Sequence, residues 1–113
     1  MTLIYKILPR AAWEAATTAG RYDGSPADLA DGYMHFSTAA QAPETAAKHF
    51  AGRGDLMVLA VPTEALGAAL KWEPSRGGAL FPHLYAPLDC GVVAWVRPAP
   101  FTAGGVHDLG VLT

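Results

Sequence analysis

The feature that most constrains the fold of this chain is an uninterrupted apolar run near its middle, "DLMVLAVP" at residues 55–62. A run this short, made of aliphatic residues and closed by a proline, indicates a β-strand with both faces buried. Such a strand has to lie inside the domain, because each of its faces needs other elements to cover it. We therefore expect this segment to be the main strand of the core.

The order of the other elements predicts the fold class. We expect further strands at residues 2–8, 31–37, 71–73, 80–85 and 91–98. Helical segments are expected at residues 9–20, 25–32 and 38–52, with a short helical turn at 63–70, because proline and glycine punctuate them as helix ends. The helices cluster in the first half and the strands in the second, with no regular β-α-β alternation. This order predicts an α+β domain with a split, mostly antiparallel β-sheet and two or three short helices.

Composition indicates one compact domain over residues 1–113, since 51% of the residues are hydrophobic and only 16% are charged. The formal net charge of −2 provides no basic surface, so we expect no nucleic-acid partner. No apolar run approaches the ~20 residues of a membrane span, and the N-terminus lacks the pattern of a signal peptide. Cys90 is the only cysteine, which fits a reducing compartment. We expect a cytoplasmic protein that does not enter membranes; its oligomeric state is not indicated.

The first motif is "DGYMHFST", residues 31–38. If it is extended, Tyr33, His35 and Ser37 share one face, because alternate residues of a strand point the same way. Met34 and Phe36 then point to the core. The polar face is either a functional site or a histidine that is simply satisfied by its surroundings.

Thr38 follows this strand and stands at capping-box spacing from Gln41. Backbone amides at such a helix start favour an anionic group nearby. The alternative is that Ser37 and Thr38 serve only to cap the helix. Either function remains open on these residues alone.

The second motif is "FPHLY", residues 81–85. If it is extended, His83 and Tyr85 share a face and Leu84 points to the core. Pro82 has no N–H for a sheet, so we expect an edge strand or a segment that leaves the sheet. We expect His83 to lie in one pocket with His35 on a separate strand. The alternative is a surface loop anchored by Phe81 and Leu84.

Other chemistries find less support in the sequence. The four histidines show no short metal-ligand spacing, so no metal site is expected; they are His35, His49, His83 and His107. A hydrolase triad of Ser37, His83 and Asp89 would lack the "GxSxG" turn that such serines occupy. Cys90 stands at the entry to an apolar strand, which indicates packing rather than reactivity.

"DGYMHFST" and "FPHLYAPL", with "KWE" between them, resemble a small bacterial family, the domain of unknown function 952, over nearly the whole chain. The resemblance implies a fold related to the ADP-ribosyltransferases, which bind NAD in a cleft of a split β-sheet. It further implies a nucleotide ligand, with NAD as the substrate of ADP-ribosyl transfer or of NAD glycohydrolysis.

The same resemblance implies roles for particular residues. His35 would orient the ribose, Tyr85 would stack on the nicotinamide ring, and His83 would bind phosphate or exchange a proton. The nucleotide-binding residues would be Tyr33, Ser37 and Thr38.

A catalytic carboxylate is common in that wider group, but no acid here stands in a recognisable motif; Glu73 and Asp89 are the nearest. Two other classes therefore stay open. One is a non-catalytic module that binds a nucleotide or ADP-ribose, and the other is a small structural or partner-binding domain.

Overall fold

The computed structural model describes residues 2–112, without the side chain of Arg76. The helices are α1 (Arg10–Ala19), α2 (Pro26–Asp31) and α3 (Ala42–His49). The strands are β1 (Leu3–Pro9), β2 (Arg21–Tyr22), β3 (Met34–His35), β4 (Leu56–Pro62), β5 (Leu70–Pro74), β6 (Leu80–Leu84), β7 (Leu88–Asp89) and β8 (Trp95–Pro98). Single 3₁₀ turns lie at Thr63–Ala65, Gly67–Ala69, Arg76–Gly78 and Cys90–Val92.

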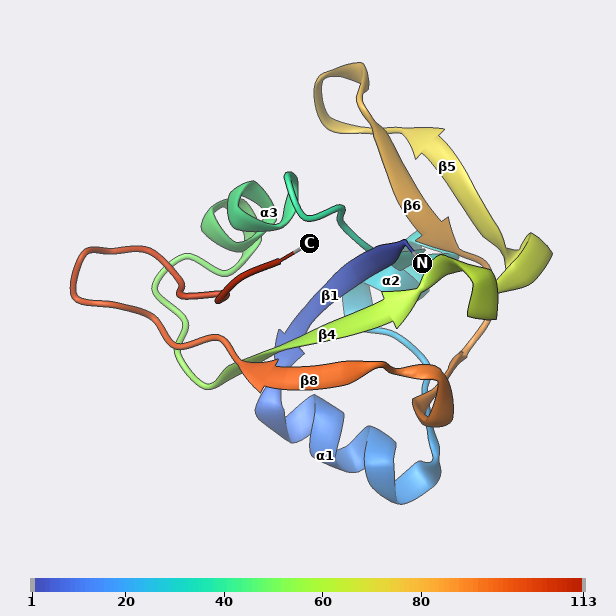
Figure 1. Ribbon diagram of the computed structural model, residues 1–113, viewed down its shortest axis with the longest axis horizontal. Helices are drawn as coiled ribbons and strands as arrows, with labels where there is room; N and C mark the ends of the chain where they lie inside the picture. Colours follow the sequence, from blue (N-terminus) through green and yellow to red (C-terminus); the bar gives the residue numbers. More distant parts are fainter. Residues whose placement is uncertain (1, 113) are drawn as a thin grey trace.

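The strands form three small antiparallel sheets in place of one large one. One has the order β1-β4-β8, the second has the order β3-β6-β5, and β2 pairs with β7. The predicted α+β class, with divided antiparallel sheets and short helices, is confirmed. The β5–β6 hairpin projects away from the β1-β4-β8 sheet, whose two faces carry α1 and α3 (Figure 1).

Strand β4 lies at the centre of the first sheet, paired with β1 on one side and β8 on the other. Side chains of one face, such as Leu59 and Val61, pack in a core that includes Ala16 of α1. Side chains of the other face, such as Val58, pack with Ala46 of α3. Because helices cover both faces, β4 is apolar at nearly every position, as the sequence predicted.

The segment that carries the first motif joins two of the sheets. The backbone N–H of Phe36 donates to the carbonyl of Pro82 on β6 at 3.0 Å. One residue later, Ser37 exchanges two backbone hydrogen bonds with Tyr5 of β1, at 2.8 and 2.9 Å. Met34 and Phe36 are 3% and 2% exposed, which confirms that they are core residues.

The prediction that Pro82 places its segment at a sheet edge is wrong. Strand β6 is the central strand of its sheet, between β3 and β5. Toward β5, Pro82 stands opposite Trp72, at a position between the residues that exchange ladder bonds, so its missing N–H costs nothing there. Toward β3 it accepts from Phe36 but cannot donate in return, and the β3 ladder ends at this point.

Several boundaries are shorter than the sequence indicated. Helix α3 begins at Ala42, not at residue 38, because Thr38 and Gln41 form a separate turn before it. In that turn the backbone N–H of Thr38 donates to Gln41 Oε1 at 3.0 Å, and the N–H of Gln41 donates to Thr38 Oγ1 at 3.2 Å. The helix ends at His49, not near residue 52. The expected strand at 31–37 is reduced to Met34–His35.

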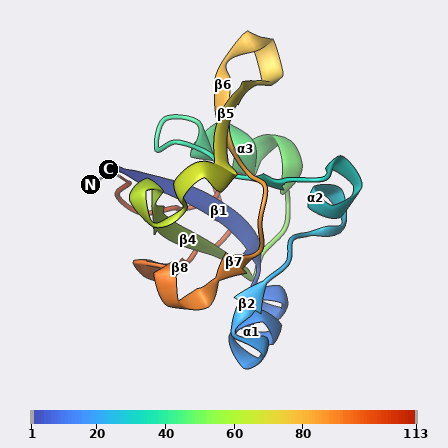
Figure 2. The same ribbon diagram turned by 90° about the vertical axis from the view of Figure 1, so that its right-hand side faces the viewer.

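Seen from the side, the β5–β6 hairpin extends at the top of the molecule and α2 lies at its right-hand side (Figure 2). Within residues 2–112, no helix is long and apolar enough to cross a membrane. The short helix α2 and one face of the β3-β6-β5 sheet together position the candidate site residues described next.

Candidate functional site

Helix α2 is a six-residue helix whose start is built around Asp28. The N–H of Asp28 donates to Ser25 Oγ at 3.1 Å, and the N–H of Ser25 donates to Asp28 Oδ2 at 2.9 Å. Gly24 precedes this capping box with φ +112, and a Cβ there would lie 2.9 Å from the Cβ of Asp28. The turn therefore needs glycine, and it directs the Asp28 side chain, 3% exposed, into the protein.

Asp28 connects three elements inside the fold. Its Oδ2 accepts from Lys6 Nζ of β1 at 2.8 Å, and its Oδ1 lies 2.5 Å from His35 Nδ1. The backbone N–H of His35 donates to the same Oδ1 at 3.1 Å, and Lys6 Nζ also donates to the carbonyl of His35 at 2.8 Å. The side chain of Lys6, which shares its strand face with apolar residues, thus has its charge paired in the core.

These contacts shift the pKa values of the buried groups. Burial alone raises the pKa of Asp28, but the hydrogen bond from His35 and the charge and hydrogen bond of Lys6 outweigh it, so the pKa is lowered well below its usual range. Burial lowers the pKa of Lys6, and Asp28 opposes that shift. Burial, with the charge of Asp28, raises the pKa of Tyr22 to about 12. Asp28 is therefore ionised at neutral pH.

His35 lies between two carboxylates. Its Nδ1 faces Asp28, and its Nε2 lies 2.8 Å from Asp31 Oδ2 at the end of α2. Only an imidazole protonated on both nitrogens can donate both bonds at once. Neither aspartate was singled out from the sequence, although Ser25 and Asp28 have capping-box spacing and Asp31 stands four residues before His35.

The second sheet brings the two histidine motifs together. His35 of β3 is the register partner of His83 of β6, which in turn is the partner of Lys71 of β5. The two imidazole rings lie 5.7 Å apart, centroid to centroid. The two histidines lie on separate strands with their rings close together, as expected; neither side chain lines the cleft described below, so the expectation that they share one pocket is not confirmed.

Glu73 of β5 holds the second motif. Its Oε1 lies 2.8 Å from His83 Nδ1 and accepts from the Tyr85 hydroxyl at 2.7 Å. Hydrogen bonds from Tyr85 and His83 lower the pKa of Glu73, and the bond to Glu73 raises the pKa of Tyr85 to about 12. The sequence offered Glu73 only as a nearby acid; the pairing of β5 with β6 brings it to both motif residues.

Tyr33 lies at the centre of the cluster. Its ring stacks on His83 at 4.1 Å and lies 4.8 Å from the ring of His35 and 5.3 Å from that of Tyr85. His83 is thereby 2% exposed, whereas Tyr85 is 42% exposed. We call the residues Tyr33, His35, Glu73, His83 and Tyr85 the aromatic cluster.

A cleft of about 380 Å³ opens beside this cluster. Its lining includes Asp23, Asp28, Leu29, Tyr33, Tyr85 and Pro87. His35, Glu73 and His83 do not line it, but they contact the lining residues Asp28, Tyr33 and Tyr85. A ligand in the cleft would therefore contact the two tyrosines directly, and His35, Glu73 and His83 only through the lining residues.

Two residues expected at the nucleotide lie elsewhere. Ser37, 4% exposed, places its Oγ 2.8 Å from Thr45 Oγ1 on α3, and Thr38 pairs with Gln41. The polar face is divided because the segment changes partner between Phe36 and Ser37, from β6 to β1. Ser37 and Thr38 thus belong to the α3 side of the fold, not to the cleft.

The hydrolase triad considered from the sequence, Ser37, His83 and Asp89, is not assembled either. Asp89 pairs with Arg21 in the β2–β7 ladder and accepts the N–H of Gly91 at 2.8 Å, while Ser37 is turned to α3. Cys90 Sγ donates to the carbonyl of Ala16 at 3.4 Å, and burial raises the pKa of its thiol. These contacts match the packing interpretation of Cys90.

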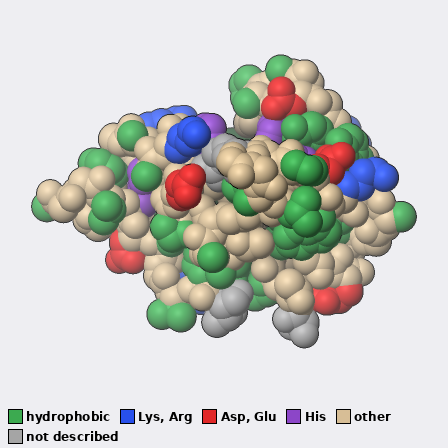
Figure 3. All heavy atoms as spheres, turned by 90° about the horizontal axis from the view of Figure 1, so that it is seen from above, with side chains coloured by type: hydrophobic (Ala, Val, Ile, Leu, Met, Phe, Trp, Pro, Cys, Tyr) green, Lys and Arg blue, Asp and Glu red, His purple; other side chains and the backbone are tan. Residues whose placement is uncertain are grey.

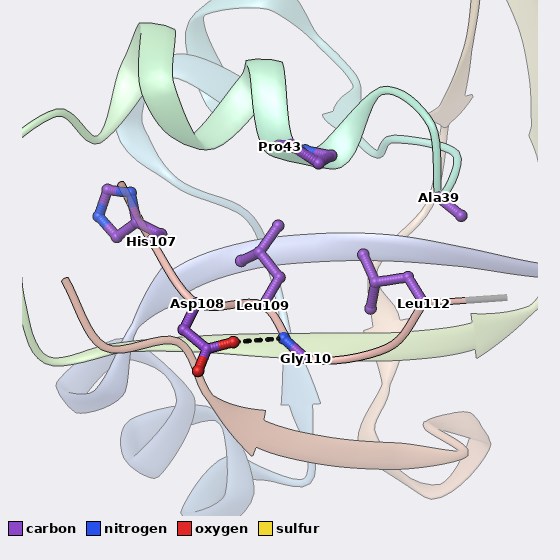
Figure 4. Close-up of a pocket in the computed structure, with 7 residues that line it drawn as sticks. All are labelled: Ala39, Pro43, His107, Asp108, Leu109, Gly110 and Leu112. Carbon is purple, nitrogen blue, oxygen red and sulfur yellow. Dashed lines mark hydrogen bonds between the residues drawn. The ribbon is translucent and has the colours of Figure 1, made fainter. Parts of the chain in front are cut away.

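A second hollow, of about 370 Å³, lies between the start of α3 and the C-terminal tail (Figure 4). Its polar side chains hold the tail in place: Asp108 Oδ1 accepts from the N–H of Gly110 at 3.0 Å, and His107 Nε2 lies 2.7 Å from the carbonyl of Arg53.

Across the described residues, no group of three or more His, Cys, Asp or Glu side chains is arranged to hold a metal ion. On the face in Figure 3, charged side chains are scattered among apolar and neutral ones.

Comparisons with known proteins give one family and no activity. A crystal structure of protein CC0527 from Caulobacter crescentus is 56% identical in sequence, with a TM-score of 0.92 and 96% of each chain covered. A solution NMR structure of CC0527 matches with a TM-score of 0.87 and 56% identity, covering 97% of this chain and 95% of that one. No curated protein matches. The family described as "Protein of unknown function (DUF952)" matches residues 7–96, and this chain belongs to it.

Proposed function

We propose that the protein binds NAD at the cleft beside the aromatic cluster and breaks the bond between nicotinamide and ribose. The outcome would be ADP-ribosyl transfer to an acceptor or, with water as acceptor, NAD glycohydrolysis. The observation that carries the proposal is Glu73, held by His83 and Tyr85 next to Tyr33 and His35. A kinship with the ADP-ribosyltransferase fold is part of the same proposal, supported by the divided antiparallel sheet.

The chemistry requires an anion close to the ribose. When the glycosidic bond breaks, its electron pair goes to the nicotinamide nitrogen, and positive charge develops on the ribose C1′ and ring oxygen. A carboxylate stabilises that charge, as in glycoside hydrolysis. Water then bonds to C1′ and releases one proton, giving nicotinamide and ADP-ribose. Glu73 suits the anionic role, because hydrogen bonds lower its pKa and its side chain is 36% exposed.

The other residues of the cluster have supporting roles. Tyr33 and Tyr85 offer aromatic faces for the nicotinamide ring. Tyr85 stays protonated at neutral pH, because its pKa is raised to about 12, so it acts as a donor and not as a base. His83 is 2% exposed, and we assign it to orienting Glu73 in preference to binding phosphate. His35 is assigned to the ribose hydroxyls, which its Nε2 would bind in exchange for the exposed Asp31.

One observation favours the second candidate, a module that binds the nucleotide without turnover. Both ring nitrogens of His35 face carboxylates, and His83 faces Glu73. The side chains of His35, His83 and Glu73 do not line the cleft. A ligand could therefore bind against the tyrosines and leave the hydrogen-bonded groups undisturbed.

Time-resolved NAD consumption, followed by separating nicotinamide from NAD, distinguishes the candidates. We expect turnover by the wild type, loss of turnover in Glu73→Gln, and unchanged turnover in Asp89→Asn, an exposed carboxylate outside the cluster. Saturable binding without turnover would support the binding module. If the protein shows neither binding nor turnover, both candidates are contradicted, and a structural or partner-binding domain remains.

A further inference from the structure

We infer that the cleft recognises the cationic nicotinamide riboside portion of its ligand and gains nothing from phosphate. A phosphate-free pyridinium riboside would then bind at least as tightly as NAD. The inference rests on the proposed function and defines the substrate class of that same cleft.

The charged residues that line the cleft carry the first part of the argument. Among the described residues they are Asp23 and Asp28, and both are acids. Asp28 is ionised at neutral pH because its pKa is lowered. One further carboxylate, Glu73, lies one contact away, on Tyr85 of the lining. Asp28 and Asp23 are paired with Lys6 and Arg21, but neither of these cations lines the cleft, so the charged groups in the lining itself are carboxylates, which favour a cation over a diphosphate.

The described cations close to the cleft are already committed or lie outside its lining. Lys6 is buried and bonds Asp28 and the carbonyl of His35. Arg21 Nε lies 2.9 Å from Asp23 Oδ1. Lys71 stands beside Glu73, whose pKa its charge helps to lower, but it does not line the cleft. A phosphate in the cleft would therefore meet no lysine or arginine among the described lining residues.

The start of helix α2 offers little to phosphate as well. Backbone N–H groups at a helix start often bind anions. Here the N–H of Ser25 donates to Asp28 Oδ2 and the N–H of Asp28 donates to Ser25 Oγ. The capping box thus satisfies these donors within the chain and places a carboxylate where an anion would bind.

The aromatic residues of the cleft carry the second part of the argument. Tyr33 and Tyr85 both line it, with ring centroids 5.3 Å apart and planes tilted by 46°. The face of a tyrosine ring attracts a cation, and the attraction grows where water is excluded. The pyridinium ring of oxidised nicotinamide is a planar cation, so it can use both the ring faces and the carboxylates.

The test is a set of calorimetric titrations with NAD, nicotinamide mononucleotide, nicotinamide riboside and reduced nicotinamide riboside, whose ring is uncharged. We expect the riboside to bind at least as tightly as NAD and more tightly than the mononucleotide. The reduced riboside should bind about tenfold more weakly than the oxidised one, because it lacks the ring charge. Added salt should weaken binding of the oxidised riboside.

Asp23→Asn is the informative variant, because Asp23 lines the cleft with an exposed side chain and can change without disturbing the core. It should weaken the riboside several-fold and improve the mononucleotide, whereas the control Asp89→Asn should change neither. Tighter binding of NAD or the mononucleotide than of the riboside would overturn the inference and leave the proposed function standing. Equal affinity for oxidised and reduced riboside would overturn it too. Absence of binding by all four ligands would contradict the proposed function itself.

Discussion

Two histidines on neighbouring strands are each held by a carboxylate, yet the two pairs lie in different surroundings. Asp28, which binds His35, is 3% exposed and also binds the buried Lys6. Glu73, which binds His83, is 36% exposed and also accepts from the hydroxyl of Tyr85. The pairs have similar bonds and opposite burial.

The difference in burial assigns different tasks to the two carboxylates. A buried charge that loses its partner cannot be solvated, so we expect the Asp28–His35 pair to contribute to the stability of the fold. A carboxylate near solvent can be replaced at little structural cost, and a ligand can reach it. We therefore expect Asp28 to position the site and Glu73 to act in it.

The largest effect is expected from Asp28→Ala. The change leaves Lys6 buried without its carboxylate and should reduce the free energy of unfolding by about 3–5 kcal/mol. Urea denaturation measures it. The control is Asp31→Ala, which removes the more exposed partner of His35 and should cost less than about 1 kcal/mol. Equal losses in the two variants would break the comparison.

Phe36→Ala provides an apolar reference, in the segment that carries His35. The side chain is 2% exposed in the core cluster, so its truncation should cost about 3–5 kcal/mol, again measured in urea. A loss below about 1 kcal/mol would show that the faces of this strand are assigned backwards.

An intermediate effect is expected from His35→Ala. The substitution removes the imidazole donor of the buried Asp28 Oδ1, which keeps only the backbone N–H of residue 35, and should cost about 1–3 kcal/mol because hydrogen bonds to charged groups are strong. If His35 also contacts the ligand, titration with NAD or ADP-ribose should show weakened binding. A stability loss with no measurable binding by the wild type would instead make His35 a structural residue.

The dependence of stability on pH should reveal the contribution of the buried carboxylate, Asp28. The pKa of Asp28 is lowered in the folded protein from its ordinary value of 3.8, so the folded state binds fewer protons than the unfolded state. The stability from this group is complete above about pH 4 and is lost as the pH falls toward the folded pKa. Urea midpoints measured across this range should fall steeply for the wild type. Asp28→Asn should show a shallower dependence.

The smallest loss of stability is expected from Glu73→Gln, whose urea midpoint should fall only slightly because the carboxylate is 36% exposed. Its effect should appear in the pKa of Tyr85, which is raised to about 12 chiefly by the hydrogen bond to Glu73 and should fall toward 10 without the carboxylate. NMR titration of the tyrosine rings measures this. Tyr22 is the internal control, because burial and Asp28 raise its pKa. An unchanged Tyr85 would show that Glu73 does not control the second motif.

The sequence alone determined the elements whose signals are local. The run at 55–62 predicted the doubly covered strand β4, because its residues are apolar on both faces. Alternation in the first motif placed Met34 and Phe36 in the core. Proline and glycine placed α1 and α2 almost to the residue, since they act on the backbone of their own turn.

Only the tertiary structure decided which polar residues meet. Glu73 joins His83 and Tyr85 because β5 pairs with β6 in one register, and no local pattern states that register. Asp28 reaches His35 because α2 docks beside β3. Ser37 leaves the site because its segment exchanges β6 for β1. Contacts between distant segments depend on how all the elements pack, so the candidate site was half visible in the sequence: its histidines and tyrosines, without the carboxylates that hold them.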